Sequence, residues 1–280
     1  TLALRAVDVA AGAQEATTVS EGAPFYFSWN PEGQRMLAHI GADELAFIHL
    51  DGSRERVDVD AGQFHAPHWS ADGQRLAYVV EGEEREGTLL VRDAGGEQTL
   101  EIASQPGTFS LNWSPDSRRL AYSFTEEWTG LVAYGPLWVR DIGTGETREL
   151  SKEPVVAFFW SPDGSKLAFL RPELRDTAPR APQTAPFRQQ TLIWLRWHVW
   201  DGERTYPLVR FSPSQSFLLD YVRYFNQYAQ SISLWSPDSR MLLFAGTSED
   251  GRAGIWTLPV EPGSLPQRVA RGTLATWAPR

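Results

Sequence analysis

The amino-acid sequence predicts an all-β fold, a six-bladed β-propeller of four-stranded antiparallel blades, closed by both termini and carrying one short inserted helix. The first observation is a turn motif that recurs along the chain, most fully as WSPDG at 160–164. The second is its spacing, because the motif tryptophans follow one another after 40, 44, 47, 75 and 42 residues, and repeats of about 40–50 residues are typical of propeller blades. These tryptophans are Trp29, Trp69, Trp113, Trp160, Trp235 and Trp277. The third is an apolar strand that runs into a glycine-containing turn later in the repeat.

Each copy of the motif predicts a β-hairpin. Serine, proline, aspartate and glycine in succession suit a type I turn, in which proline fixes φ and glycine accepts a positive φ. The tryptophan ends the first strand, and a Leu-Ala-Phe or similar triplet begins the second. We expect the motif aspartates to accept hydrogen bonds from nearby backbone N–H groups, which is a structural role. They are Asp72, Asp116, Asp163 and Asp238.

Third and fourth strands follow each hairpin. Residues 90–93, 137–141 and 197–201 have the third-strand pattern, and 146–150 has the polar pattern of an outer fourth strand. These signals divide most of the chain into five blades. The blades are placed roughly at 25–60, 64–104, 109–152, 156–213 and 231–271.

The two termini predict the closing blade. Residues 2–8 have the third-strand pattern, 15–19 indicate a fourth strand, and 273–277 resemble a first strand. We therefore expect 1–20 and 273–280 to form one blade, which leaves few open sheet edges. Its second strand is missing, so we expect the natural protein to have further residues. All 280 residues are expected to form a single propeller domain.

Two insertions interrupt the repeat at the fourth blade. Residues 171–190 contain four prolines, and their four arginines outnumber one Glu and one Asp, so they predict a long basic loop between strands. Residues 214–230 have aromatic side chains at helical spacing and predict a short helix. These aromatic residues are Phe217, Tyr221, Tyr224, Phe225 and Tyr228.

The repeat resembles the WD40-like, or PD40, repeat of TolB-type β-propellers, on the pattern Trp-Ser-Pro-Asp-Gly followed by Leu-Ala-Phe. Related repeats occur in the propeller domains of prolyl-oligopeptidase-type enzymes. The resemblance covers essentially the whole chain and implies the propeller fold. It also implies an extracytoplasmic location, in the periplasm or at the cell surface. Many roles use this scaffold, so the resemblance implies less about function.

Composition excludes several classes of function. The net charge of −9 argues against general nucleic-acid binding, which needs a basic face. The absence of cysteine excludes disulfides, cysteine metal sites and thiol catalysis. No run of about 18 apolar residues is present, so membrane insertion is not expected. No charged-then-apolar leader opens the sequence.

The polar residues show no recognisable catalytic pattern. His65 and His68 lie three residues apart and would point to opposite faces of a strand, while the remaining histidines, His39, His49 and His198, are scattered. The sequence lacks the G-x-S-x-G motif, a phosphate-binding glycine loop and a dinucleotide fingerprint. We therefore expect no metal, no cofactor and no enzymatic activity in this chain.

The sequence favours a non-catalytic propeller that serves as a protein-interaction or ligand-binding scaffold. Two alternatives remain: the accessory propeller of a prolyl-oligopeptidase-like peptidase or other hydrolase, and a metal-dependent propeller enzyme. A protein partner is expected at the two insertions, because loops carry function and because arginine and tyrosine dominate interface hot spots. The candidate partner-binding residues are Arg175, Arg180, Phe187, Arg188, Tyr221 and Tyr224.

Overall fold

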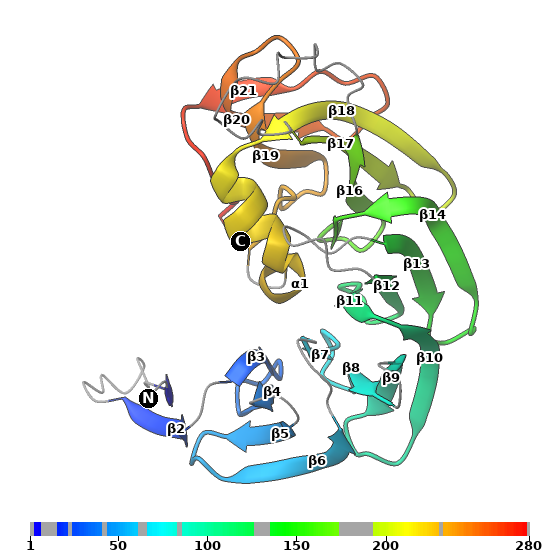
Figure 1. The fold of residues 1–280 in the computed structure, drawn as a ribbon, viewed down its shortest axis with the longest axis vertical. Helices are drawn as coiled ribbons and strands as arrows, with labels where there is room; N and C mark the ends of the chain where they lie inside the picture. The colour runs from blue at the N-terminus through cyan, green and yellow to red at the C-terminus, as the bar shows by residue number, and fades with distance from the viewer. Residues whose placement is uncertain are drawn as a thin grey trace, which may run out of the picture. The chain divides into compact units, whose positions relative to one another are not determined.

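The computed structural model describes residues 3–6, 16–21, 24–40, 44–60, 66–82, 86–125, 135–173, 193–229 and 232–278. These residues form antiparallel β-structure with one short helical segment (Figure 1). The all-β class and the four-stranded antiparallel sheets expected from the repeats are therefore confirmed. The count of six blades and the closure of the ring by both termini stay predictions.

The chain forms two compact units. The first unit contains residues 1–128 and 137–149, and the second contains 129–136 and 150–280. A single domain over the whole chain stays a prediction.

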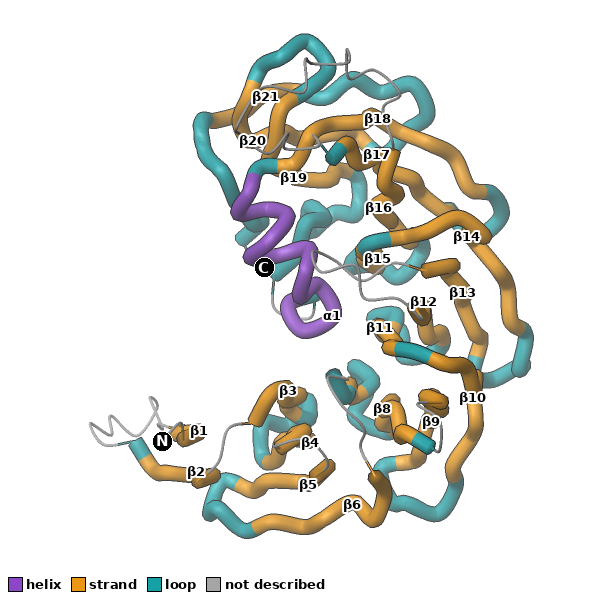
Figure 2. Tube along the Cα trace, in the orientation of Figure 1, coloured by secondary structure: helices purple, strands orange, loops and turns teal. Residues whose placement is uncertain are grey.

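The first unit contains a short N-terminal hairpin and the sheets that we call blades 1 to 3. The hairpin pairs β1 (Ala3–Ala6) with β2 (Thr17–Glu21). Blade 1 contains β3 (Pro24–Trp29), β4 (Arg35–Ile40), β5 (Glu44–His49) and β6 (Arg54–Asp60). Blade 2 contains β7 (His68–Trp69), β8 (Arg75–Glu81), β9 (Glu86–Asp93) and β10 (Thr99–Pro106). In both blades the strands pair in chain order (Figure 2), as the repeat predicted.

Blade 3 contains strands that belong to both units. Its strands are β11 (Thr108–Trp113), β12 (Arg119–Thr125), β13 (Gly135–Asp141) and β14 (Thr147–Val155). The four strands again follow one another in chain order across the sheet. The last residues of β14 belong to the second unit.

The second unit continues with blades 4 and 5, which share one seven-stranded sheet. Blade 4 contains β15 (Ala157–Trp160), β16 (Leu167–Glu173), β17 (Trp194–Trp200) and β18 (Thr205–Pro213). Blade 5 contains β19 (Met241–Thr247), β20 (Ala253–Pro259) and β21 (Gln267–Ala270), and a bridge from Trp235 to Leu242 marks its first strand. The end of β18 pairs with β19 at Pro213 and Gly246. A side chain at Gly246 would collide with the carbonyl oxygen of Ser212, so this junction requires glycine.

Alternate residues of β8, the second strand of blade 2, pack on opposite neighbouring blades, which explains why its Leu-Ala-Tyr run is apolar throughout. In β8, Leu76 and Tyr78 join a core with Leu37 and Phe47 of blade 1. The intervening Ala77 and Val79 join a second core with Phe109, Leu111 and Trp113 of blade 3. Both faces of the strand are thus buried, as expected for sheets stacked on both sides.

Repeated hydrogen bonds join neighbouring blades. The indole Nε1 of Trp113 donates to the carbonyl oxygen of His68 at 3.2 Å, and that of Trp235 donates to Phe159 O at 2.9 Å. In both cases the acceptor immediately precedes the motif tryptophan of the previous blade. The C-terminal segment follows the same rule, because Trp277 Nε1 donates to Leu234 O at 3.2 Å.

A serine hydroxyl forms a second link at two of these joints. Ser117 and Ser239 occupy the last motif position with φ values of 59° and 60°, where other copies have glycine. The hydroxyl of Ser117 accepts a hydrogen bond from the Asp72 backbone N–H at 2.9 Å, and that of Ser239 accepts one from Asp163 N–H at 3.1 Å. These serines therefore connect the turns of successive blades.

The structure corrects two predicted boundaries. Strand β16 continues through Glu173, so residues 171–173 belong to the sheet and not to the predicted loop, because they pair with β17. Residues 273–277 are not a regular strand, although Trp277 N–H donates to Ser233 O at 3.2 Å.

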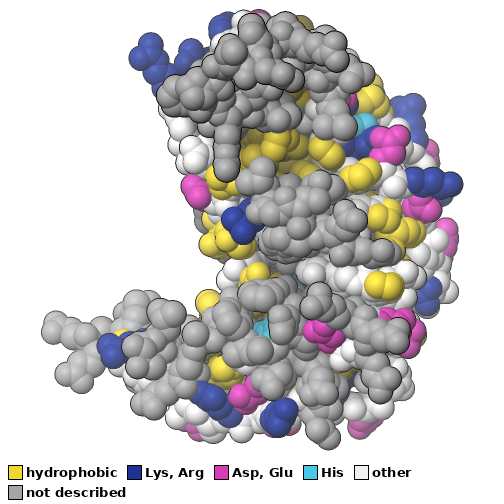
Figure 3. Space-filling model, in the orientation of Figure 1, with side chains coloured by type: hydrophobic (Ala, Val, Ile, Leu, Met, Phe, Trp, Pro, Cys, Tyr) yellow, Lys and Arg dark blue, Asp and Glu magenta, His cyan; other side chains and the backbone are white. Residues whose placement is uncertain are grey.

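On the face shown in Figure 3, acidic and basic side chains are interspersed among the described residues.

Candidate functional site

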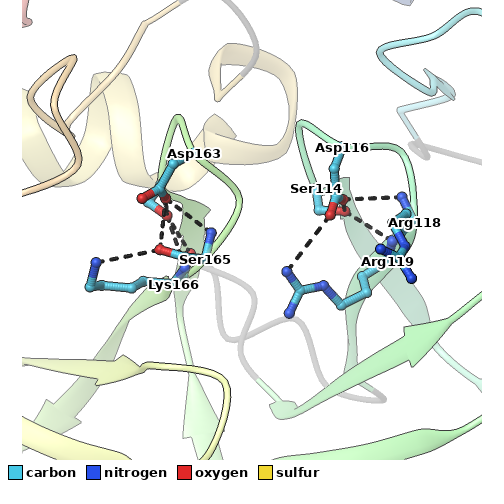
Figure 4. Close-up of polar contacts among 8 residues, drawn as sticks. Ser114, Asp116, Arg118, Arg119, Asp163, Ser165 and Lys166 are labelled. Carbon is cyan, nitrogen blue, oxygen red and sulfur yellow. Dashed lines mark hydrogen bonds and ion pairs between the residues drawn. The ribbon is translucent and has the colours of Figure 1, made fainter.

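The motif aspartates have the structural role that the sequence predicted. In the turn after β15, Asp163 Oδ1 accepts hydrogen bonds from Ser161 Oγ at 2.6 Å and from Ser165 N–H at 2.9 Å (Figure 4). Burial acts to raise the pKa of Asp163, but these hydrogen bonds outweigh burial and hold it at about 2. Asp116 has equivalent bonds to Ser114 Oγ and Arg118 N–H in the turn after β11 (Figure 4). The Asp163 carboxylate is therefore ionised, and the hydrogen bonds of both aspartates fix their turns.

Three arginines lie on adjacent strands of blade 4. Arg171 of β16 is the cross-strand partner of Arg196 of β17, which in turn is the partner of Arg210 of β18. Like charges directly opposite one another destabilise a sheet. The arrangement therefore depends on carboxylates between the guanidinium groups.

Carboxylates from three different segments supply the negative charge. Glu173 accepts a hydrogen bond from Arg196 Nη2 at 3.3 Å and lies 3.8 Å from Arg210 Nη1. Glu249 forms an ion pair with Arg210, and Glu153 forms one with Arg171. The hydrogen bond from Arg196 holds the pKa of Glu173 below its usual value, against the effect of burial. We call these three arginines, with Glu153, Glu173 and Glu249, the arginine cluster.

Two aromatic groups accompany the arginine cluster. The guanidinium of Arg210 lies 5.8 Å from the ring centroid of Trp194. His198 stacks on Phe169, with ring centroids 5.3 Å apart. Burial, together with the Arg171 and Arg196 charges, lowers the pKa of His198 to about 4. The imidazole is therefore neutral at physiological pH.

A helical insertion follows β18, as the sequence predicted. It consists of a π-helix, η2 (Phe217–Tyr221), a 3-10 helix, η3 (Val222–Tyr224), and one α-helical turn, α1 (Phe225–Tyr228). Tyr221 is buried, stacks on Phe159 at 5.8 Å and donates its hydroxyl hydrogen to Ile232 O at 2.9 Å. Tyr224 is half-buried, and the Arg223 guanidinium lies 5.4 Å from its ring centroid.

The predicted partner-binding residues are therefore distributed unequally. Tyr224 is accessible, whereas Tyr221 is part of the core and holds the insertion in place. The other four, Arg175, Arg180, Phe187 and Arg188, lie outside the described residues.

The arginine cluster was not among the sites predicted from the sequence. Its signal was present in the alternation of Arg171 with Glu173 and of Arg196 with His198, because residues two apart on a strand share a face. The misplaced loop boundary hid it by assigning Arg171 and Glu173 to a loop.

Within the described ranges, no group of three or more His, Asp or Glu side chains is placed to hold a metal ion. His68 is buried, and His65 lies outside those ranges. The metal-free expectation stays a prediction. None of the helices in the described part of the chain has the length and apolar character needed to cross a bilayer.

Comparisons with known proteins point to one kind of fold. No family model matches the chain. The chain is 31% identical over 128 residues to the Tol-Pal system protein TolB of Chromobacterium violaceum, an alignment that covers 45% of the chain and 24% of TolB. It is 24% identical over 99 residues to a putative tricorn-like protease C-terminal subunit of Sulfurisphaera tokodaii, covering 35% of the chain and 11% of that protein. The chain thus matches only a small part of each relative.

Solved structures share the propeller fold. An oligogalacturonate lyase in complex with manganese has a TM-score of 0.58 at 14% identity, covering 91% of this chain and 68% of the lyase. The β-propeller domain of the Trilobed protease from Pyrococcus furiosus has a TM-score of 0.51 at 14% identity, covering 89% of this chain and 72% of that domain. At this identity the likeness concerns the fold alone. The repeats and these similarities show that the chain resembles TolB-like β-propellers in its repeat pattern and its fold.

Proposed function

We propose that this chain is a binding module whose protein partner contacts blade 4. The observation that carries the proposal is the arginine cluster, in which three arginines on adjacent strands stay partly exposed to solvent. Arginine beside tryptophan, as in Arg210 and Trp194, is typical of interface hot spots. One interruption of the repeat lies within this blade and the other directly follows it.

The electrostatics of the cluster favour an acidic partner. Glu249 and Glu153 are 52% and 70% exposed at their side chains, and exposed ion pairs contribute only ~0–1 kcal/mol. A partner carboxylate can therefore replace either glutamate at little cost. Arg175, Arg180 and Arg188 would add to this surface, with Phe187 and Tyr224 as aromatic contacts. An acidic patch on the partner would also accelerate association.

The likeness to TolB further supports an extracytoplasmic location for this chain. The match to a tricorn-like protease subunit supports the alternative of an accessory propeller in a peptidase. The two differ in whether the blade-4 partner is a separate protein or a catalytic domain of the same protein.

Removal of the basic insertion tests the proposal. Residues 175–190 would be replaced by a short Gly/Ser link, which leaves Glu173 and its ion pairs in place. We expect the melting temperature to stay unchanged and partner capture from an extract of the source cells to be lost. Capture of the same partners by the shortened protein would contradict the proposal.

A pair of point variants tests the arginine cluster itself. Arg210→Gln removes one guanidinium of the cluster, and Arg56→Gln removes an exposed arginine on β6 as the matched control. Capture should weaken in the first variant alone. Equal capture by both would place the partner on another surface.

A further inference from the structure

A pocket of about 360 Å³ lies in the first unit, beside the motif turns of blades 1 and 2. Its lining includes Asn30, Glu32, Arg35, His49, Trp69 and Asp72. Small-molecule sites have volumes of ~300–1,000 Å³, so this pocket suits a small ligand.

The pocket lies at a joint that lacks the two links seen elsewhere. Gly73 occupies the position of Ser117 and Ser239, so this turn position supplies no hydroxyl to the joint. A hydrogen bond from the Trp69 backbone N–H to Ser28 Oγ, at 3.2 Å, connects the two blades instead. The indole Nε1 of Trp69, a residue that is only 4% exposed, has no hydrogen-bond partner among the described residues. An unpaired buried donor costs free energy, so this joint is less well satisfied than the joints at Trp113 and Trp235.

Arg35 supplies a positive charge to the pocket. Its guanidinium lies 4.6 Å from the Phe47 ring centroid and 5.2 Å from that of Trp69. Stacking of this kind uses the face of the guanidinium and leaves its in-plane N–H donors available. No carboxylate in the described ranges lies within ion-pair distance of Arg35. Its equivalent in blade 2, Arg75, instead donates to Ser117 O at 3.5 Å.

Negative charge also lines the pocket. Burial acts to raise the pKa of Asp72, but hydrogen bonds from Ser70 and Gln74 outweigh burial and lower it, so this carboxylate is ionised. Glu32 adds a second, exposed carboxylate. One available cation and two carboxylates favour a ligand that carries both signs of charge over a dianion such as phosphate.

We propose that this pocket binds a small zwitterion of the amino-acid type. The ligand carboxylate pairs with the planar donors of Arg35, a geometry that suits a guanidinium. The ammonium group of the ligand lies toward Glu32 and Asp72. This site belongs to the first unit and does not depend on the proposed partner surface of blade 4.

Two serine substitutions form a matched test. Gly73→Ser supplies the missing hydroxyl beside the pocket, whereas Gly33→Ser changes the same turn position in blade 1, where an added Cβ meets nothing within 4 Å. Both glycines have φ of 69°, close to the values that Ser117 and Ser239 already hold. An added Cβ at Gly73 lies 3.1 Å from Pro31 Cδ, so a small shift of the proline accommodates it. Circular dichroism and melting curves check that both variants fold.

Binding is measured by isothermal titration calorimetry of the full chain with each common L-amino acid at millimolar concentration and low salt. Acetate, methylammonium and inorganic phosphate serve as probes with a single sign of charge. We expect at least one amino acid to bind the wild type and the Gly33→Ser variant, and none to bind Gly73→Ser. Arg35→Lys keeps the charge but loses the planar fork, and should weaken binding about 10-fold.

Three results would overturn the proposal. The first is that no amino acid binds the wild type. The second is that Gly73→Ser or Arg35→Lys binds as tightly as the wild type. The third is that acetate or phosphate binds as tightly as the best amino acid, which would show that a single negative charge is sufficient.

Discussion

Replacement of motif tryptophans tests whether the repeat is held by its blade joints. Trp235 is 1% exposed, and its indole donates to Phe159 O at 2.9 Å. Trp29 occupies the same motif position in blade 1 but is 38% exposed. The two residues share a turn context and differ in burial, so Trp29→Ala is the matched control for Trp235→Ala.

The expected magnitudes follow from this difference in burial. Trp235→Ala should lower the free energy of unfolding by about 3–5 kcal/mol, because it removes a buried ring and leaves a cavity. Trp235→Phe keeps most of the ring but leaves the buried Phe159 carbonyl without its donor, and should cost about 1–3 kcal/mol. Trp29→Ala should cost less than about 1 kcal/mol.

Hydrogen exchange of backbone amides gives these values for each unit separately. Trp235→Ala should lower the protection of amides in β15 to β20, and Trp29→Ala should leave protection in blade 1 nearly unchanged. A loss of unfolding free energy below about 1 kcal/mol for Trp235→Ala, or equal losses for the two variants, would contradict the claim that the blade joints stabilise the repeat.

Two further predictions concern the second unit. In denaturant unfolding, Ser239→Ala should lower the free energy of unfolding by about 1 kcal/mol, because the Asp163 N–H loses its acceptor. Ser239→Gly should be nearly neutral, because glycine relieves the strain of the positive φ. Equal losses in the two variants would contradict this balance between the hydrogen bond and the backbone strain. The pKa of His198 is lowered from 6.5 to about 4 in the folded protein, so the unfolded chain binds a proton more readily between these two values. The free energy of unfolding should therefore be highest above pH 6.5 and should fall as the pH is lowered toward 4. With solvent screening, this loss of unfolding free energy should be roughly 1–2 kcal/mol. Urea titrations at several pH values should show the loss in the wild type and not in His198→Gln. The same pH dependence in both proteins would contradict the assignment to His198.

The strands could be predicted from the sequence because the same turn motif and the same apolar run recur several times along the chain. A turn motif with fixed serine, aspartate and glycine positions determines a hairpin, and the apolar runs behind it follow from burial on both faces. Trp113, Trp160 and Trp235, which recur in phase with this repeat, are buried. The sequence also predicted the helical insertion, because aromatic spacing at 3.6 residues survives in an irregular segment.

The candidate site was less predictable because it depends on pairing between distant segments. Glu249 meets Arg210 across 39 positions of the chain, and no local pattern specifies that contact. Tyr221 was expected at a partner surface, but an aromatic stripe gives spacing and not the direction of each ring, and this ring lies in the core. The serine links between blades were equally hidden, since Ser117 and Ser239 resemble ordinary substitutions for glycine.

Site-specific photo-crosslinking tests the proposed partner surface most directly. A photoreactive residue at Glu249, in the arginine cluster, would be compared with one at Leu100, an exposed position on β10 in the first unit. Partner proteins present in an extract of the source cells should become crosslinked at position 249 and not at position 100. Crosslinking of the same partner at position 100, with none at position 249, would contradict the assignment of the partner surface to blade 4.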